Sequence, residues 1–322
     1  MFNLVGKKIL NYPQFAFVPL EILDLELYEV YNSVDKQMEV ANYMAEYFPT
    51  DFVAPLDDGV LFKEVIGVPL IKFPKDSPSS KEAIMFTVED IKSAKKIIIE
   101  KEPRMKKNLE VIRRLKNKYP EKEIILSLEG PFTLAGELAS PEKLARKLIR
   151  DKEFVKELLK YTVSIIKEYA AAGVNAGATV VQISEPLGVI LNNKRFAEYI
   201  TPHVKEIWED LDCYRVLHVC GDTTKLLNGM KATGCHGISI DQIMDMEKVL
   251  KENKDVTVIG NLDPVDSVFK KSPTELKQEI QEFLEKMSKY PNFIFSTGCD
   301  CVTKTPIENL RILVEEVNNF KK

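Results

Sequence analysis

The segment from Val216 to Gly260 reads VLHVCGDTTKLLNGMKATGCHGISIDQIMDMEKVLKENKDVTVIG, and its pattern recurs along the chain. Three short apolar runs, at residues 216–218, 237–240 and 256–260, alternate with longer stretches of helical amphipathic character. Short β-branched runs that alternate with helices are typical of βα units and indicate a parallel sheet. The segment therefore predicts three strands of one parallel sheet with helices between them.

The same alternation extends outward in both directions. Four further strands are predicted at residues 52–54, 124–128, 180–183 and 293–296, and residues 15–19 are the candidate for an eighth. Helix starts are marked by Ser140-Pro141, Asp151 and Ser272-Pro273. Eight such units in 322 residues predict an α/β fold, a (β/α)8 TIM barrel. A doubly wound sheet is the alternative.

Composition narrows the classes of protein that the chain can represent. It is 45% hydrophobic and 29% charged, as ordinary globular proteins are, with a net charge of -4. Lysines and arginines are spread along the helices, which argues against nucleic acid or a membrane surface as partner. No window approaches the roughly 18 apolar residues of a membrane span, and residues 1–8 lack a signal-peptide core. We therefore expect a cytoplasmic protein whose five cysteines stay reduced.

No Gly/Ser or Pro-rich linker divides the chain, so residues 1–322 are predicted to form a single domain. In a (β/α)8 barrel, the active residues follow the carboxyl ends of the strands. Polar and metal-binding residue types gather at these positions. They are Asp57 and Asp58, Glu129, Glu185, His218 and Cys220, Asp241, Asn261 and Asp263, and Cys299 and Cys301.

The His-x-Cys pair is the most specific element of this set. Residues two apart on a strand project to the same face, so His218 and Cys220 can reach one ion. Cys299, from the end of another strand, is a third soft ligand, and zinc favours imidazole and thiolate. Three protein ligands leave one coordination position open, which is the pattern of a catalytic zinc site. The alternative is that both cysteines are ordinary core residues.

Longer motifs link the chain to a known family. They are Gly130-Pro-Phe-Thr-Leu, Ile183-Ser-Glu-Pro-Leu-Gly, Leu217-His-Val-Cys-Gly, Gly260-Asn-Leu-Asp-Pro and Thr297-Gly-Cys-Asp-Cys-Val-Thr-Lys-Thr-Pro. With these, residues 52–315 resemble the uroporphyrinogen decarboxylase superfamily, and within it the methylcobamide:coenzyme M methyltransferases. Residues 1–50 match only loosely. The decarboxylases have an arginine-rich stretch near the N-terminus, whereas this chain has no arginine before residue 100, which favours the methyltransferase branch.

The resemblance implies a catalytic zinc on His218, Cys220 and Cys299, where a thiol such as coenzyme M receives a methyl group from a corrinoid. Asp241 is expected either as a fourth zinc ligand or as a partner of His218. Glu185 is expected at the corrinoid contact or in the pocket wall. The chain lacks the Asp-x-His-x-x-Gly signature of cobalamin-binding domains, so the corrinoid (cobalamin) is expected on a separate methylated corrinoid protein.

Three alternatives remain open from the sequence. The first is a corrinoid methyltransferase working in the opposite sense, from a small methyl donor to the corrinoid protein. The second is a decarboxylase of the uroporphyrinogen type, and the third is a zinc-binding barrel without catalytic activity. The segment Pro55-Leu-Asp-Asp-Gly differs from the sequence usual at this place in the methyltransferases, so the identity of the thiol is left open.

Overall fold

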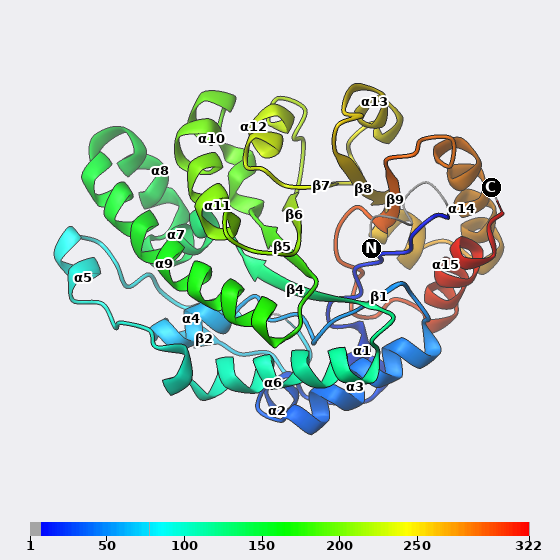
Figure 1. Cartoon of the computed structure of the whole chain (residues 1–322), viewed down its shortest axis with the longest axis horizontal. Helices are drawn as coiled ribbons and strands as arrows, with labels where there is room; N and C mark the ends of the chain where they lie inside the picture. Colours follow the sequence, from blue (N-terminus) through cyan, green and yellow to red (C-terminus); the bar gives the residue numbers. More distant parts are fainter. Residues whose placement is uncertain (1–7, 77, 322) are drawn as a thin grey trace.

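The computed structural model describes residues 8–76 and 78–321 and contains a curled parallel sheet of seven strands surrounded by helices (Figure 1). The expectation that residues 1–8 contain no signal-peptide core falls mainly on residues 1–7, which lie outside the described residues. The strands follow one another around the sheet in sequence order. They are β1 (Phe52–Val53), β4 (Glu123–Glu129), β5 (Val180–Ser184), β6 (Tyr214–Val219), β7 (Gly237–Ile240), β8 (Thr257–Leu262) and β9 (Phe293–Thr297).

The eighth position of the barrel is occupied by a short segment before β1. Asn11 forms a parallel bridge with Phe295 of β9, and the Tyr12 amide donates to the Phe295 carbonyl at 2.9 Å. On the other side, the Asn11 amide donates to the Asp51 carboxylate just before β1. The barrel class is thus confirmed, with this segment beside β9 near the centre of Figure 1.

The prediction of an eighth strand at residues 15–19 is wrong. These residues turn into the helix α1 (Val18–Ile22), where Pro19 lies in the first helical turn. Proline is favoured there because the first amides of a helix have no intrahelical partner, whereas a strand loses a ladder hydrogen bond. The apolar run at 15–19 therefore packs as a helix start, and residues 10–12 provide the strand-like pairing.

Helices cover the outside of the sheet (Figure 1). Asp151 caps the longest of them by accepting from the Phe154 amide, and Ser272 and Glu275 form a capping box. The α-helices are α1, α2 (Leu27–Tyr31), α3 (Val34–Tyr47), α4 (Leu61–Ile66), α5 (Val88–Lys92), α6 (Pro103–Lys118), α7 (Pro131–Ala139), α8 (Pro141–Arg150), α9 (Lys152–Ala176), α10 (Asn193–Tyr199), α11 (Thr201–Trp208), α12 (Leu227–Ala232), α13 (Met246–Glu252), α14 (Pro273–Met287) and α15 (Ile307–Asn319).

Shorter elements complete the chain: the 3-10 helices η2 (Ile99–Lys101) and η3 (Pro186–Ile190), the π-helix η4 (Pro264–Phe269), and a small antiparallel pair, β2 (Leu70–Ile71) and β3 (Ser79–Ser80). Among the described residues, no helix combines the length and the apolar character that crossing a membrane requires.

The interior of the barrel changes character from one end to the other. A lower layer is apolar, with one or two inward side chains from most of the strands: Leu10, Tyr12, Phe52, Ile125, Val180, Val216, Ile259 and Ile294. Because side chains two residues apart share a face, the next layer toward the carboxyl ends is formed by Ser127, Gln182, His218, Ser239, Asn261 and Ser296. The apolar layer closes the barrel, and the polar layer forms the floor of a site.

Because residues 10–12 close the barrel, we predict that Leu10→Ala strongly destabilises the fold. Leu10 is 1% exposed and packs in the apolar layer, so the change should lower the free energy of unfolding by about 2–5 kcal/mol. Urea unfolding measures this value. Ile149→Ala is the control, since Ile149 is 66% exposed and should cost less than about 1 kcal/mol. Equal losses in the two variants would contradict the assignment.

Candidate functional site

The three predicted zinc ligands meet at the carboxyl end of the barrel. His218 is the penultimate residue of β6, Cys220 follows that strand directly, and Cys299 follows β9 after Gly298. One ligand atom from each residue lies within 4.8 Å of the other two. The structure thus brings together side chains that are up to 81 positions apart in the sequence.

The sulfur-to-sulfur distance in this cluster is close to that of a tetrahedral zinc site, whereas the nitrogen-to-sulfur distance is shorter than that geometry gives. The Cys220 and Cys299 sulfurs are 3.9 Å apart, and His218 Nε2 lies 3.1 Å from the Cys220 sulfur. With Zn–S bonds of about 2.3 Å and Zn–N bonds of about 2.0 Å, tetrahedral geometry puts ligand atoms roughly 3.5–3.8 Å apart. Both cysteines are free thiols and are only partly buried, so their sulfurs are accessible from the cavity.

His218 is held in the orientation that such a site needs. Its Nδ1 lies 3.0 Å from the hydroxyl oxygen of Ser239 on the neighbouring strand β7, and its Nε2 faces the sulfurs. A partner on one ring nitrogen fixes the tautomer and directs the other nitrogen to the metal. Ser239 is fully buried, and the register of β6 and β7 places it beside His218. The sequence analysis missed this residue.

Asp241 accepts hydrogen bonds from two backbone amides beside the site. Its Oδ2 accepts from the Gly221 amide at 2.8 Å and its Oδ1 accepts from the Ile243 amide at 3.1 Å. It is absent from the cluster of ligand atoms, and Ser239 is the partner of His218. Of the two expected roles, the histidine partner is Ser239 in this structure, and a fourth-ligand role for Asp241 stays a prediction. Its carboxylate fixes the backbone that follows Cys220.

Residues 241–244 form a loop that also positions the second cysteine. A β-carbon on Gly298 would lie 2.2 Å from the backbone nitrogen of Gln242, so only glycine allows β9 to pass this loop. The side-chain amide of Asn261 donates to the carbonyls of Asp241 and Met244 at 3.0 and 2.8 Å. The 241–244 loop therefore lies between the segments that carry Cys220 and Cys299 and contacts both.

The two sulfurs behave as a pair that shares a proton. The hydrogen bond with Cys299 raises the pKa of the Cys220 thiol, and burial adds to this shift. The same hydrogen bond and one from His218 lower the pKa of Cys299 to about 4. A thiol whose pKa is lowered releases fewer protons when it binds a soft cation as the thiolate.

Glu185 lies behind the wall of the site. It is fully buried, and its two carboxylate oxygens accept from the Phe132 amide at 2.9 Å and from the Thr133 amide and hydroxyl at 2.8 and 2.7 Å. A β-carbon on Gly130 would lie 2.2 Å from this side chain. Burial raises the pKa of Glu185 to about 7. In this position Glu185 anchors the N-terminus of α7, behind the residues that line the cavity.

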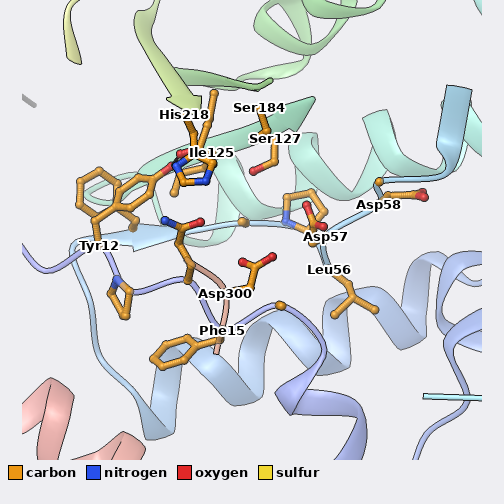
Figure 2. A pocket seen from close by; sticks show the side chains of 18 of the residues that line it. Tyr12, Phe15, Leu56, Asp57, Asp58, Ile125, Ser127, Ser184, His218 and Asp300 are labelled. Carbon is orange, nitrogen blue, oxygen red and sulfur yellow. Dashed lines mark hydrogen bonds between the residues drawn. The ribbon is translucent and has the colours of Figure 1, made fainter. Parts of the chain in front are cut away.

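A cavity of about 330 Å³ opens over the three ligand residues (Figure 2). Figure 2 shows His218, Ser127 and Ser184 on one side and Phe15 and Leu56 on the other, with Asp57 and Asp300 reaching into the space between them. The volume lies in the range of sites that bind small organic molecules.

Residues before β1 contribute much of this cavity. Tyr12, Gln14 and Phe15 line it together with parts of α3, and the Tyr12 hydroxyl donates to Gln182 at 2.8 Å. The sequence analysis missed these residues because no motif marks them. Their one sequence signal is the apolar run at 15–19, which was assigned to a strand.

The acidic residues predicted near the mouth are all present, in unequal roles. Asp57 and Asp300 reach the cavity, and burial together with the neighbouring Asp57 raises the pKa of Asp300 to about 7. Asp58 also lines it but pairs with Arg104 at 2.6 Å. Asp263 caps η4 instead, by accepting from the amides of Val265 and Asp266. Cys301 is buried, outside the ligand cluster.

Comparison with known proteins now identifies the family. The Uroporphyrinogen decarboxylase (URO-D) family pattern matches residues 22–320. The chain belongs to the uroporphyrinogen decarboxylase family. It is 32% identical to the methylcobamide:CoM methyltransferase MtbA of Methanosarcina acetivorans over 77% of this chain and 73% of that protein. It is 28% identical to the uroporphyrinogen decarboxylase of Carboxydothermus hydrogenoformans over 82% of this chain and 79% of that protein.

Among solved structures, a methyltransferase from Methanosarcina mazei superimposes with a TM-score of 0.86, at 20% identity, over 98% of this chain and 97% of that one. This likeness establishes the fold. The family and the enzyme class expected from the sequence, a methyltransferase of this superfamily, are confirmed by the sequence matches.

Glu129 at the end of β4 predicts a pH dependence of stability. Burial raises its pKa from 4.5 to about 8, and Lys63 offsets only part of the shift. Between these pH values the folded state binds more protons than the unfolded state, so stability falls as pH rises. Glu129→Gln removes this decrease of stability with rising pH, because glutamine does not ionise. Its stability relative to wild type should grow by up to about 1 kcal/mol per pH unit between pH 5.5 and 7.5.

Urea unfolding at three pH values in this range measures the difference. The exposed Glu142→Gln is the matched control and should follow wild type at each pH. Parallel stability curves for wild type and Glu129→Gln would contradict the assigned shift.

Proposed function

We propose that this protein is a zinc-dependent methyltransferase that moves a methyl group from a methylated corrinoid protein to a thiol such as coenzyme M. The observation that carries the proposal is the meeting of His218, Cys220 and Cys299 within 4.8 Å at the mouth of the barrel. The name of the Methanosarcina acetivorans relative, a methylcobamide:CoM methyltransferase, supports the same donor and the same kind of acceptor.

The donor set fits zinc. Two sulfurs at 3.9 Å and an imidazole nitrogen oriented by Ser239 are soft ligands with tetrahedral spacing, and three ligands leave room for a substrate atom. When bound there, zinc lowers the pKa of a thiol and so supplies a thiolate at neutral pH. The ligand cysteines donate charge to the metal, which keeps a bound sulfur nucleophilic.

The rest of the site would place the two substrates. The thiol occupies the cavity, between the polar side with Ser127 and Ser184 and the apolar side with Phe15. The transfer would release the thiol proton to solvent, join the sulfur to the methyl carbon, and leave the electron pair of the broken cobalt–carbon bond on the corrinoid. The products are a thioether and the cobalt(I) corrinoid. The corrin ring docks over the mouth because the cavity holds only a small molecule.

The decarboxylase alternative is disfavoured by the cavity. No arginine or lysine is among the described residues that line it. A porphyrinogen with several carboxylates would need cationic partners, of which guanidinium groups are the strongest. The opposite direction of transfer uses the same residues, so the choice between the two directions rests on the assay below.

Thiol-dependent demethylation of methylcobalamin tests the proposal. The purified protein should contain about one zinc per chain and convert methylcobalamin to cob(I)alamin when a thiol is present. Cys220→Ala and Cys299→Ala should lose the zinc and lower the rate at least about 100-fold. Cys213→Ala is the control, since Cys213 lies outside the cluster. Full zinc retention in Cys220→Ala would exclude this site.

Removing the partner of His218 should weaken metal binding without abolishing it. Ser239→Ala is expected to lower zinc affinity about 10–100-fold, because the imidazole loses its fixed orientation. Competition with a chromophoric chelator measures the affinity. Ser164→Ala is the control, since that hydroxyl is bonded within α9 on the surface. An unchanged affinity in Ser239→Ala would show that the hydroxyl does not orient the ligand.

A further inference from the structure

We infer that the far end of the thiol substrate carries an anionic oxygen group, a sulfonate or a carboxylate, which binds to the hydroxyls of Ser127 and Ser184 and to the side-chain amide of Gln14. The inference rests on the proposed function and specifies how its thiol is held. It follows from hydrogen-bond donors that line the cavity and have no partner in the described part of the protein.

The two serines provide hydroxyls on neighbouring strands. Ser127 lies on β4 and Ser184 on β5, and both side chains line the cavity. In Figure 2 they lie on the same side of the cavity as His218. Within residues 8–76 and 78–321, neither hydroxyl forms a hydrogen bond with the protein. A serine hydroxyl at the surface of a cavity can donate its proton to a bound ligand.

Strand register places these hydroxyls within reach of a short thiol. Ser184 is paired directly with His218, and β4 follows on the far side of β5. Ser127 is paired with Gln182, two residues deeper than Ser184. Neighbouring strands are about 4.8 Å apart, so the two serines lie at one and about two strand spacings from His218. A thiol whose sulfur lies at the ligand cysteines can therefore reach both serines through a short spacer.

Gln14 gives an independent indication of a missing acceptor. Its side-chain nitrogen is buried and has no hydrogen-bond partner. Its backbone is held in place, since its carbonyl accepts from the Cys301 amide at 2.8 Å and its amide donates to the Thr297 hydroxyl at 3.3 Å. A buried donor without an acceptor is costly, so an oxygen of the ligand would stabilise it.

The acidic residues of the lining are compatible with an anion. Arg104 pairs with Asp58 at 2.6 Å. Burial raises the pKa of Glu129 to about 8, so this carboxyl is largely protonated at neutral pH. Burial also raises the pKa of Asp57 and of Asp300. These side chains therefore present much less negative charge than their number suggests.

Neutral donors are then what the cavity offers to a charged end. No lysine or arginine is among the described lining residues. Hydrogen bonds from neutral donors to a charged oxygen are roughly twice as strong as those between neutral groups. A sulfonate or a carboxylate supplies only acceptors, which suits the two hydroxyls and the Gln14 amide. An ammonium group supplies only donors and would leave the Gln14 nitrogen without a partner.

Binding of thioethers that differ only in their polar end tests the inference. The probes are 2-(methylthio)ethanesulfonate, 3-(methylthio)propanoate and 2-(methylthio)ethanol, and calorimetry on the zinc-loaded protein gives their affinities. We expect at least one anion to bind about tenfold or more tightly than the alcohol, and the tighter of the two distinguishes a sulfonate from a carboxylate. Tightest binding of the alcohol, or equal binding of all three, would overturn the inference.

Variants locate the subsite. Ser127→Ala and Ser184→Ala should each lower the affinity for the preferred anion about tenfold and leave that for the alcohol nearly unchanged. Gln14→Glu replaces a donor by an acceptor of similar shape and should lower the affinity for the anion further. Metal analysis should give the same zinc content in all three variants as in wild type.

Ser164→Ala is the matched control, since its hydroxyl donates to the Tyr161 carbonyl on the surface of α9. This variant should bind every probe as wild type does. A preference for the anion that persists in all three cavity variants would overturn the inference, and so would an equal loss of affinity for the anion and the alcohol.

The corresponding thiols separate this inference from the proposed function. In the methylcobalamin assay, Ser127→Ala should raise the KM of the anionic thiol about tenfold with little change in kcat, because the hydroxyl holds the end that does not react. Equal kcat/KM for anionic and neutral thiols in wild type would retain the methyltransferase and exclude the subsite. Anion-selective thioether binding without demethylation by any thiol would retain the subsite and exclude the direction of transfer.

Discussion

The 241–244 loop is the constraint on which the site depends. It lies between two strands that deliver one cysteine each, and it fixes both through backbone contacts. Asp241 accepts the amide of Gly221, and Gln242 meets the backbone at Gly298 so closely that no side chain fits there. Asn261 holds the loop from β8. The sulfur-to-sulfur distance of 3.9 Å is therefore set by rigid neighbours, as a preorganised metal site requires.

Two chemical environments share one cavity. At its floor, soft ligands and a hydrogen-bonded imidazole suit a metal that activates sulfur. Toward the mouth, acidic side chains line the cavity, among them Asp57 and Asp300 and the Asp58 that pairs with Arg104.

Local patterns in the sequence were enough to predict the barrel and the three residues that meet at its carboxyl end. Apolar runs between capped helices predict the parallel strands, and the rule that active residues follow strand ends selects His218, Cys220 and Cys299. Such local patterns do not reveal which residues, distant in the sequence, pair with one another. Residues 10–12 join β9 through two backbone hydrogen bonds, and Ser239 reaches His218 only through strand register. For the same reason the sequence does not reveal that Asp241 accepts from the amides of Gly221 and Ile243.

X-ray absorption at the zinc edge tests the central claim most directly, because it reports the ligand atoms themselves. The account predicts two sulfurs at about 2.3 Å and one nitrogen at about 2.0 Å, with a third sulfur when a thiol is added. Loss of the zinc signal in Cys299→Ala would assign it to this site. A zinc ion bound only by oxygen and nitrogen, or a sulfur count that does not rise with thiol, would contradict the account.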